Sequence, residues 1–346
     1  MKIVIVPDSF KECLSAKDVA GAMAHAVSNL LPDAEIITIP LADGGEGTVD
    51  VLAGALHADI CKCTVHDPVG RLIDAAYAFA GDMAIIEVAQ ACGLQLLYKS
   101  ERNPLTASSR GVGELIMDAY RNGVRKYIIG LGGTATCDGG AGMLSVSGVK
   151  DVLKECAVEL LCDVTAPFIG PHGAARVFAP QKGASPEDVE VIEKRMKALA
   201  EAMRQETGTD VSDIPGAGAA GGIAGALMAY SRAKVSSGAA RIMELSGFEK
   251  AIEGADLIIT GEGKSDCQTL MGKVPYCVLN KSKGIPVVLM SGRIDDREEL
   301  ISAGFHNLIE VSSRDVPLSE VIRPETALIS IKNAVISFFN KNYKIV

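Results

Sequence analysis

The sequence predicts an α/β protein in which a parallel sheet, built from both ends of the chain, is interrupted by an inserted α/β domain with a mixed sheet. Three observations predict it: strands and helices alternate over residues 1–60, closely spaced strands follow over residues 61–89, and three buried-strand runs lie near the C-terminus. We expect residues 1–64 with 254–346 to form the first domain and residues 65–253 the second. A chain of 346 residues, 48% of them hydrophobic, is long enough for two domains.

The N-terminal segment consists of two pairs of a strand and a helix. Residues 2–6 and 35–40 are apolar runs typical of buried strands, and residues 16–31 and 48–58 have helical periodicity. This alternation is typical of parallel strands joined by right-handed crossovers. Both strands end in polar loops, "PDSFKECLSA" and "LADGGEGT". Ligands of open α/β sheets bind at the carboxyl ends of strands, so these loops are the first candidates for a site.

The middle segment has a different pattern. Over residues 61–89 the short turns "PVG" and "GD" predict antiparallel pairing. A helix is expected over residues 111–123 and a strand over 126–131, which leads directly into the glycine-rich loop "GGTATCDGGAGM". Ser185 is expected to N-cap a long charged helix. The run "AGGIAGALMAY", residues 220–230, is expected to be a small-residue helix suited to close packing.

The C-terminal segment contains the buried-strand runs "ADLIITGEG", "IPVVLMSG" and "NLIEVSS". Each of them again ends in a loop with polar or charged groups. We expect these three runs to pair with the two N-terminal strands in one parallel sheet, which leaves the middle of the chain as the inserted domain.

The composition excludes several classes of function. A net charge of −9, 4% aromatic residues and no tryptophan argue against binding of nucleic acid. No run offers the roughly 20 apolar residues of a membrane span, and no signal peptide is visible, so we expect a cytoplasmic protein without membrane partners. The nine cysteines are expected to be reduced packing residues, because Cys61 and Cys63 lack the second pair that a zinc site needs.

Acidic and basic side chains recur in the loops that follow strands. Each one alone is more often a turn former or a solvated side chain, and only their recurrence beside glycines favours chemistry. Carboxylates gathered at one cleft would need a cation, and Mg²⁺ held by one or two carboxylates and substrate phosphates is a common solution. Phosphoryl transfer also needs positive groups. The carboxylates are Asp8, Asp43, Glu46, Asp138, Asp163, Glu262 and Asp266, and the cations are Lys11, Arg71, Lys182, Lys264 and Lys273.

Familiar catalytic motifs are missing. The sequence contains no G-x-x-x-x-G-K-[ST] phosphate loop and no G-x-S-x-G elbow. The G-x-G-x-x-G match at Gly216 follows a proline-led loop rather than a strand, so helix packing explains it better than a dinucleotide site. A nicotinamide-dependent dehydrogenase, the second class suggested by the α/β pattern, is therefore disfavoured.

The ordered phrases "PDSFKECLSA", "LADGGEGT", "DPVGR", "GLGGTATCDGGAGML", "APQKGAS", "PGAGAAGG" and "TGEGKSDCQTLMGKVP" resemble the bacterial type-1 glycerate kinases from Lys2 to about Gly292. The resemblance implies transfer of the γ-phosphoryl group of ATP, as its Mg²⁺ complex, to a hydroxyl of D-glycerate, with 2-phosphoglycerate as the usual product. It also implies a Rossmann-like domain interrupted by a second α/β domain, with the active site in the cleft between them, and it leaves a homodimer open. No Walker A loop is expected in this family.

The resemblance also implies roles for individual residues. Asp43 is favoured over Asp266 as the acceptor of the hydroxyl proton, and Arg71 suits the glycerate carboxylate because arginine can donate two parallel hydrogen bonds. The implied catalytic residues are Asp43, Lys11, Asp266 and Lys182; the substrate-binding residues are Asp8, Ser9, Arg71 and Glu46; the nucleotide-binding residues are Gly132, Gly133, Thr134 and Asp138; and the Mg²⁺ ligands are Glu262 and Asp163.

Several positions depart from the family's pattern. Cys137 and Ala166 stand where asparagine is usual, and Lys264 and Ser265 stand where arginine and an apolar residue are common. The segment after Met143 looks shorter than in the family, which usually has an extra strand and loop there. Two alternatives therefore stay open: a kinase for another small hydroxy acid, or a non-catalytic metabolite-binding relative.

Overall fold

A computed structural model describes residues 1–343 of the chain. These residues form two compact units, each with its own sheet. Unit 1 consists of Met1–Asp43 and the chain from Ala239 onward, and unit 2 is Gly44–Gly238. Within the described residues no helix has both the length and the apolar composition that crossing a bilayer requires.

The boundaries of the two units fall earlier in the chain than the expected positions near residues 65 and 254. Helix α2 (Thr48–Leu56) packs against strands β4 (Leu72–Ala80) and β5 (Met83–Glu87), so it belongs to unit 2. Helical periodicity predicts the element but not the sheet on which it packs. From the alternation of strand and helix we expected α2 in the first domain, but the helix packs on the sheet of unit 2.

The sheet of unit 1 is entirely parallel and combines strands from both ends of the chain, as the sequence predicted. Its strands are runs of apolar, largely β-branched residues, which suit a sheet that is covered on both faces. In spatial order they are β13 (Asn307–Glu310), β11 (Val287–Ser291), β9 (Leu257–Gly261), β1 (Lys2–Pro7) and β2 (Glu35–Thr38).

The order of these strands creates a topological switch point beside β1. From β1 the chain continues to β2 on one side, and the later strands β9, β11 and β13 follow one another on the other side. The connection that follows β1 and the connection that follows β9 therefore run toward opposite edges of the sheet, and the switch point lies between these two strands. In open α/β sheets this is where ligands bind, just beyond the carboxyl ends of the strands. The loops that follow Pro7 and Gly261 occupy that position.

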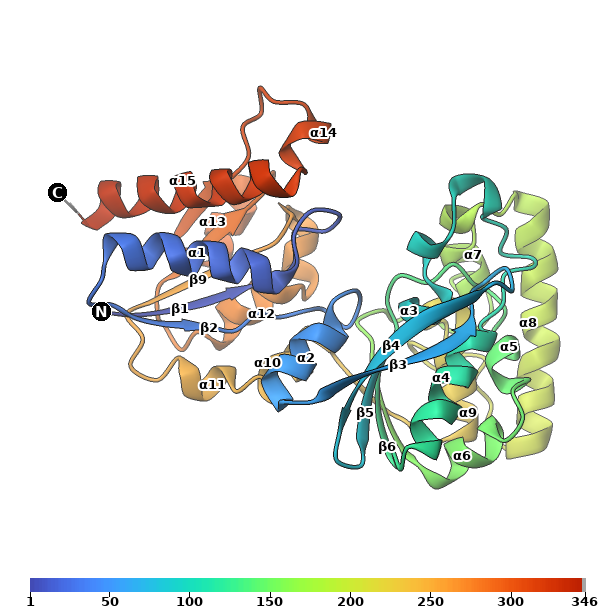
Figure 1. The fold of residues 1–346 in the computed structure, drawn as a ribbon. Coiled ribbons are helices and arrows are strands. Elements are labelled where there is room, and N and C mark those ends of the chain that lie inside the picture. The colour runs from blue at the N-terminus through green and yellow to red at the C-terminus, as the bar shows by residue number, and fades with distance from the viewer. Residues whose placement is uncertain (344–346) are drawn as a thin grey trace. The chain divides into compact units, whose positions relative to one another are not determined.

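Two long helices cover one face of this sheet. Helices α1 (Ala16–Leu30) and α15 (Pro324–Tyr343) lie side by side (Figure 1), and Met23 and Phe339 are buried against Ile5 and its neighbours. Ser15 begins α1 by accepting a hydrogen bond from the N–H of Asp18. The remaining elements of unit 1 are α10 (Gly238–Leu245), α11 (Phe248–Ala251), β10 (Lys264–Ser265), η5 (Cys267–Met271), α12 (Val274–Lys281), β12 (Arg293–Ile294), α13 (Arg297–Ala303) and α14 (Leu318–Val321).

The sheet of unit 2 is mixed, as the sequence predicted. Its first three strands are antiparallel and its last four, beginning with β5, are parallel. The core lies between this sheet and the helices packed on it, with Tyr127, Phe168 and Ile116 among the buried side chains. In spatial order the strands are β3 (Asp59–His66), β4, β5, β6 (Lys126–Gly130), β7 (Ala157–Leu161) and β8 (Lys234–Ser236).

The helices of unit 2 agree with the sequence with one correction. Ser185 caps the long helix as expected, but the small-residue helix begins only at Ile223, because Ala220, Gly221 and Gly222 have left-handed φ angles of 54°, 65° and 94°. The elements are α3 (Ala89–Cys92), η1 (Leu94–Leu96), η2 (Lys99–Glu101), α4 (Arg110–Arg121), α5 (Ala141–Leu144), α6 (Val149–Glu155), α7 (Ala174–Phe178), η3 (Pro180–Lys182), α8 (Pro186–Thr207), η4 (Ala219–Gly222) and α9 (Ile223–Tyr230).

Candidate active site

The switch point of unit 1 brings together charged residues from the two N-terminal loops. Asp8 directly follows β1, and its N–H donates to the carbonyl oxygen of Gly261 at 2.8 Å. Its carboxylate oxygen Oδ1 accepts the N–H of Ser9 at 2.6 Å, and the residue is only 5% exposed. Lys11 is paired with Asp43 through Nζ and Oδ2 at 3.3 Å, and 61% of the lysine side chain is exposed. This group unites predicted residues of two separate loops.

The electrostatic environment of Asp8 favours its neutral form. Burial raises the pKa of Asp8, the nearby Asp43 carboxylate raises it further, and the N–H of Ser9 and the ammonium group of Lys11 lower it. The result is a pKa of about 7. A carboxyl group with this pKa exchanges protons near neutral pH.

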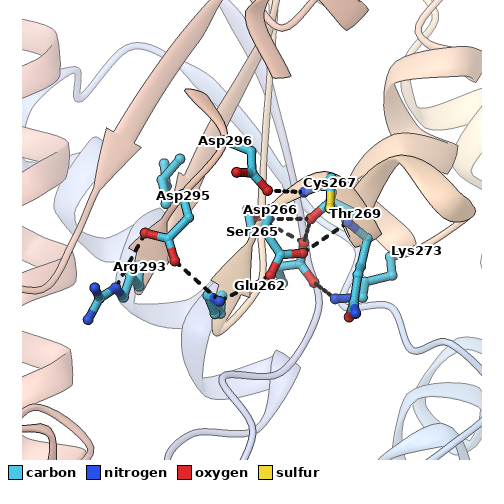
Figure 2. Close-up of polar contacts among 12 residues, drawn as sticks. Glu262, Ser265, Asp266, Cys267, Thr269, Lys273, Arg293, Asp295 and Asp296 are labelled. Carbon is cyan, nitrogen blue, oxygen red and sulfur yellow. Dashed lines mark hydrogen bonds and ion pairs between the residues drawn. The ribbon is translucent and has the colours of Figure 1, made fainter. Parts of the chain in front are cut away.

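Glu262 follows β9 on the other side of the switch point and is only 6% exposed. Its Oε1 accepts hydrogen bonds from Ser265 Oγ at 2.9 Å and Thr269 Oγ1 at 2.6 Å, and Lys273 Nζ lies 3.5 Å from Oε2 (Figure 2). Burial raises the pKa of Glu262 although these partners oppose the shift. Since both oxygens are engaged, the side chain holds the loop after β9 and is poorly placed to bind a metal ion.

Asp266 lies in a surface ion-pair network. Its Oδ2 is 3.1 Å from Lys264 Nζ, which also lies 3.2 Å from Asp295, and its Oδ1 accepts the N–H of Gln268. Partial burial opposes the shift, but Lys264 and the N–H of Gln268 lower the pKa of Asp266. A carboxylate stabilised in this way is a weak proton acceptor, which argues against Asp266 as the general base.

In unit 2, Gly130 at the end of β6 and Gly132 at the start of the loop "GGTATCDGGAGM" allow close packing against Gly44 and Gly45. A Cβ atom at Gly130 would lie 2.5 Å from the carbonyl oxygen of Gly44, and one at Gly132 would lie 2.6 Å from the Cα of Gly45. Both positions therefore need glycine so that the "LADGGEGT" loop can lie against the end of β6. Close packing is sufficient to explain why residue 132 is a glycine. The contact with the nucleotide that we expected of Gly132, Gly133 and Thr134 stays a prediction.

Asp138 organises this loop from within. Its Oδ2 accepts hydrogen bonds from the N–H and the Oγ of Ser109 and from the N–H of Gly142, and its Oδ1 accepts the N–H of Gly140, all at 2.8–3.0 Å. Four donors leave little capacity for a ligand. The geometry therefore favours a loop-shaping role over the expected contact with the nucleotide.

Lys182 is a buried cation beneath the same loop. It is 3% exposed, and Nζ donates to Thr134 Oγ1 at 3.0 Å and to the carbonyl oxygen of Thr136 at 2.7 Å. Within residues 1–343 no carboxylate forms an ion pair with it. A buried ammonium group without a counter-charge is costly, so its place under a glycine-rich loop favours a bound anion. Cys137 is also buried, and burial raises the pKa of its thiol.

Arg71 does not have the free guanidinium group that the sequence suggested. Nε donates to Asp67 at 2.6 Å, Nη1 to Glu101 at 2.8 Å and Nη2 to the carbonyl oxygen of Leu96 at 2.9 Å. If the guanidinium group of Arg71 binds a substrate carboxylate, that carboxylate must displace some of these partners. Substrate binding by Arg71 therefore stays a prediction, and these partners could not be foreseen because Glu101 lies 30 residues away in the sequence.

The two expected Mg²⁺ ligands lie in different units, and their role stays a prediction. Glu262 belongs to unit 1 and Asp163 to unit 2, where Asp163 Oδ1 accepts the N–H of Gly238 at 3.1 Å. Among residues 1–343 no group of three His, Cys, Asp or Glu side chains has a metal-binding arrangement. Glu46, the remaining expected substrate residue, is exposed in unit 2. None of the nine cysteines, all of which lie within residues 1–343, forms a disulfide, and Cys267 is exposed, so the expectation that every cysteine packs in the core is wrong for that residue.

Glu87 is a buried carboxyl group beside the end of the "LADGGEGT" loop, and the sequence analysis did not identify it as a candidate. It ends β5, is buried, and accepts the N–H of Val49 at 2.6 Å at the beginning of α2. Burial is the main cause that raises the pKa of Glu87 to about 7. The sequence does contain one signal that could have identified it. Glu87 is a single glutamate within the apolar run "AIIEVA", and a charged residue is unusual in a buried strand.

The stability of unit 2 should depend on the ionisation of Glu87. Because its folded-state pKa is raised above 4.5, its contribution is fully present below pH 4.5 and is lost as the pH rises through about 7. Glu87→Gln keeps an acceptor for Val49 and removes the charge, so we expect it to raise the thermal midpoint at pH 8 by roughly 5 °C. At pH 5 the two proteins should melt together. An equal shift at both pH values would contradict this account.

A parallel sheet with a buried carboxyl at its switch point, and a glycine-rich loop above a buried lysine, define an α/β enzyme that handles small anionic substrates. The sequence matches the glycerate kinase family over residues 3–151 and 144–339. The chain therefore belongs to this family of ATP-dependent phosphotransferases.

Named relatives agree with this assignment. The chain is 40% identical to the glycerate 2-kinase of Escherichia coli K12 over 328 residues, 86% of each protein, and 36% identical to the glycerate kinase of Halalkalibacterium halodurans over 376 residues, 98% of this chain and 99% of that protein. A solved structure of a glycerate kinase 2 candidate from Salmonella typhimurium LT2 has a TM-score of 0.83 and 36% identity and covers 99% of both chains. The alignment of 376 residues is longer than this chain and therefore contains gaps, and the two matched family segments overlap at residues 144–151.

Proposed function

We propose that this protein phosphorylates D-glycerate with ATP to give 2-phosphoglycerate. The observation that carries the proposal is the group of Asp8, Lys11 and Asp43 at the switch point of unit 1, in loops that lie within the part of the chain that matches the family. The similarity to a protein named glycerate 2-kinase supports the 2-position as the acceptor.

In this proposal the exposed ammonium group of Lys11 binds an anionic group of the substrates. Its ion pair with Asp43 has a separation of 3.3 Å and leaves most of the lysine side chain in solvent. A cation in this position can neutralise charge on the transferring phosphoryl group, which is the main catalytic requirement of such reactions. Ser9, which is half-buried beside it, is placed to contact the same substrate.

Unit 2 supplies a second set of groups in the proposal. The loop over residues 132–143 offers backbone N–H donors and threonine hydroxyls, and Lys182 places a positive charge beneath it. Such an arrangement suits the phosphates of ATP.

Mg²⁺ enters this proposal as part of the MgATP substrate. Both oxygens of Glu262 already face protein partners, which argues against this residue as a metal ligand. Mg²⁺ usually keeps several waters and binds largely through nucleotide phosphates, so no such protein cage is required.

The product of the reaction tests the proposal. Phosphorus NMR of a reaction with D-glycerate and MgATP should show 2-phosphoglycerate growing in step with ADP. Formation of 3-phosphoglycerate would contradict the proposed acceptor position. A parallel panel of other small hydroxy acids tests the alternative left open by Cys137 and Ala166, and faster turnover of any of them would favour that alternative.

A further inference from the structure

We propose that Asp8 accepts the proton of the glycerate hydroxyl during phosphoryl transfer. The proposal rests on the glycerate kinase reaction above and assigns the general base within it. The sequence favoured Asp43 for this role and placed Asp8 among the substrate-binding residues. The geometry of the switch point reverses that order.

The carboxyl group of Asp8 is held in one position by the strands on which it lies. Its backbone N–H is bonded to Gly261, so Asp8 extends the pairing of β1 with β9 by one residue. Oδ1 accepts the N–H of Ser9. Oδ2 has no hydrogen-bond partner among residues 1–343, so one oxygen fixes the orientation and the other is available to a substrate hydroxyl. A positioned acceptor of this kind is the geometric requirement for a general base.

The neighbours of Asp8 suit it to this task. The charged groups that act on it are Asp43 on the loop after β2, Glu262 on the loop after β9, and Lys11 on its own loop. Burial and the two carboxylates raise its pKa to about 7, against the opposing effects of Ser9 and Lys11. A base with a pKa near the working pH accepts a proton readily and is still largely ionised at slightly alkaline pH.

The other carboxylates of unit 1 are less suitable. Asp43 is paired with Lys11, and Asp266 is paired with Lys264. Both oxygens of Glu262 already have partners. The ion pair stabilises the carboxylate of Asp266 and so weakens it as a proton acceptor, and one oxygen of Asp43 is taken by Lys11. Asp8 is the buried carboxyl of this group with an oxygen left for the substrate.

The reaction step balances without a further reactant. The hydroxyl oxygen of glycerate forms a bond with the γ-phosphorus of ATP, and the bond from that phosphorus to the β,γ-bridging oxygen breaks to release ADP. The hydroxyl proton moves to Oδ2 of Asp8. Release of this proton to solvent restores the carboxylate for the next turnover.

Asp8→Asn tests the assignment because it keeps the acceptor for the Ser9 N–H and removes the basic oxygen. We expect kcat to fall at least 100-fold while KM for glycerate changes less than about threefold. In the wild type, kcat/KM should decline as the pH falls through about 7, and this inflection should disappear in the variant. Asp33→Asn, an exposed position of unit 1 outside the site, is the matched control and should behave as the wild type.

Each other outcome overturns the assignment. An Asp8→Asn variant with kcat within a few-fold of the wild type would refute it, as would recovery of the variant by raised Mg²⁺, which would make Asp8 a metal ligand. If Asp8→Asn does not fold, the dependence of the wild-type kcat/KM on pH tests the assignment alone. A profile without an inflection between pH 6 and 8 would refute the role of Asp8 as the general base. A wild-type protein without glycerate-dependent ADP release would instead overturn the proposed function itself.

Discussion

Lys182→Met is expected to lower kcat for glycerate phosphorylation by 100-fold or more. The ammonium group of Lys182 is buried and its described partners, Thr134 and Thr136, are neutral, so its charge is available to an anionic ligand at the loop. Loss of one preorganised charge-stabilising donor in a water-poor site typically costs 10²–10³-fold in kcat. Steady-state kinetics with varied ATP measures the effect, and KM for ATP should rise as well.

Methionine nearly matches lysine in shape, so the fold of unit 2 should survive this change. The carbonyl oxygen of Thr136 would lose its donor, which costs about 1–3 kcal/mol and lowers the thermal midpoint by several degrees. Lys194→Met, on the exposed side of α8, is the matched control and should leave kinetics unchanged. If Lys182→Met and Lys194→Met have the same kcat, Lys182 has only a structural role.

Gly261→Ala is expected to prevent unit 1 from folding. A Cβ atom at this position would overlap the carbonyl oxygen of Met290 on the neighbouring strand β11. The Cβ atom is fixed to the backbone at the end of β9 and the oxygen belongs to the backbone of β11, so the clash cannot be relieved by a side-chain rotation. We expect a loss of more than about 4 kcal/mol, at the extreme of single substitutions, seen as insoluble protein or loss of the unit 1 melting transition.

Gly21→Ala provides the control within the same unit. Gly21 lies in α1, where an added Cβ atom would contact nothing within 4 Å. Alanine favours a helix over glycine by about 0.5–1 kcal/mol, so this variant should be slightly more stable than the wild type. A Gly261→Ala protein with a wild-type melting curve would show that β9 and β11 are spaced differently.

Much of the fold could be predicted because its signals are local. Apolar runs such as "KIVIV" and "LIITG" specify buried parallel strands, and Ser185 followed by Pro186 specifies a helix start. The unit to which α2 belongs could not be predicted, because helical periodicity does not show which sheet a helix packs on. The helix after residue 220 began late because its glycines adopt left-handed conformations that the small-residue pattern does not reveal.

The candidate site was predicted in part. Asp8, Lys11 and Asp43 follow neighbouring strands, and parallel strands bring such loops to one edge of the sheet. Arg71 is hydrogen-bonded to Glu101, and Asp138 is hydrogen-bonded to Ser109. Each pair is separated by about 30 residues in the sequence, and no spacing rule predicts such contacts. The order of suitability among the carboxylates likewise depends on burial and ion pairing rather than on sequence position.

Glycerate-dependent release of ADP is the most direct test of the central claim. The purified protein, assayed with MgATP in a coupled ADP assay, should release ADP at a rate that saturates with D-glycerate and falls to background without it. Release that is no faster with D-glycerate than without it, over a range of metal ions and substrate concentrations, would contradict the claim that this protein is a glycerate kinase in function as well as in family.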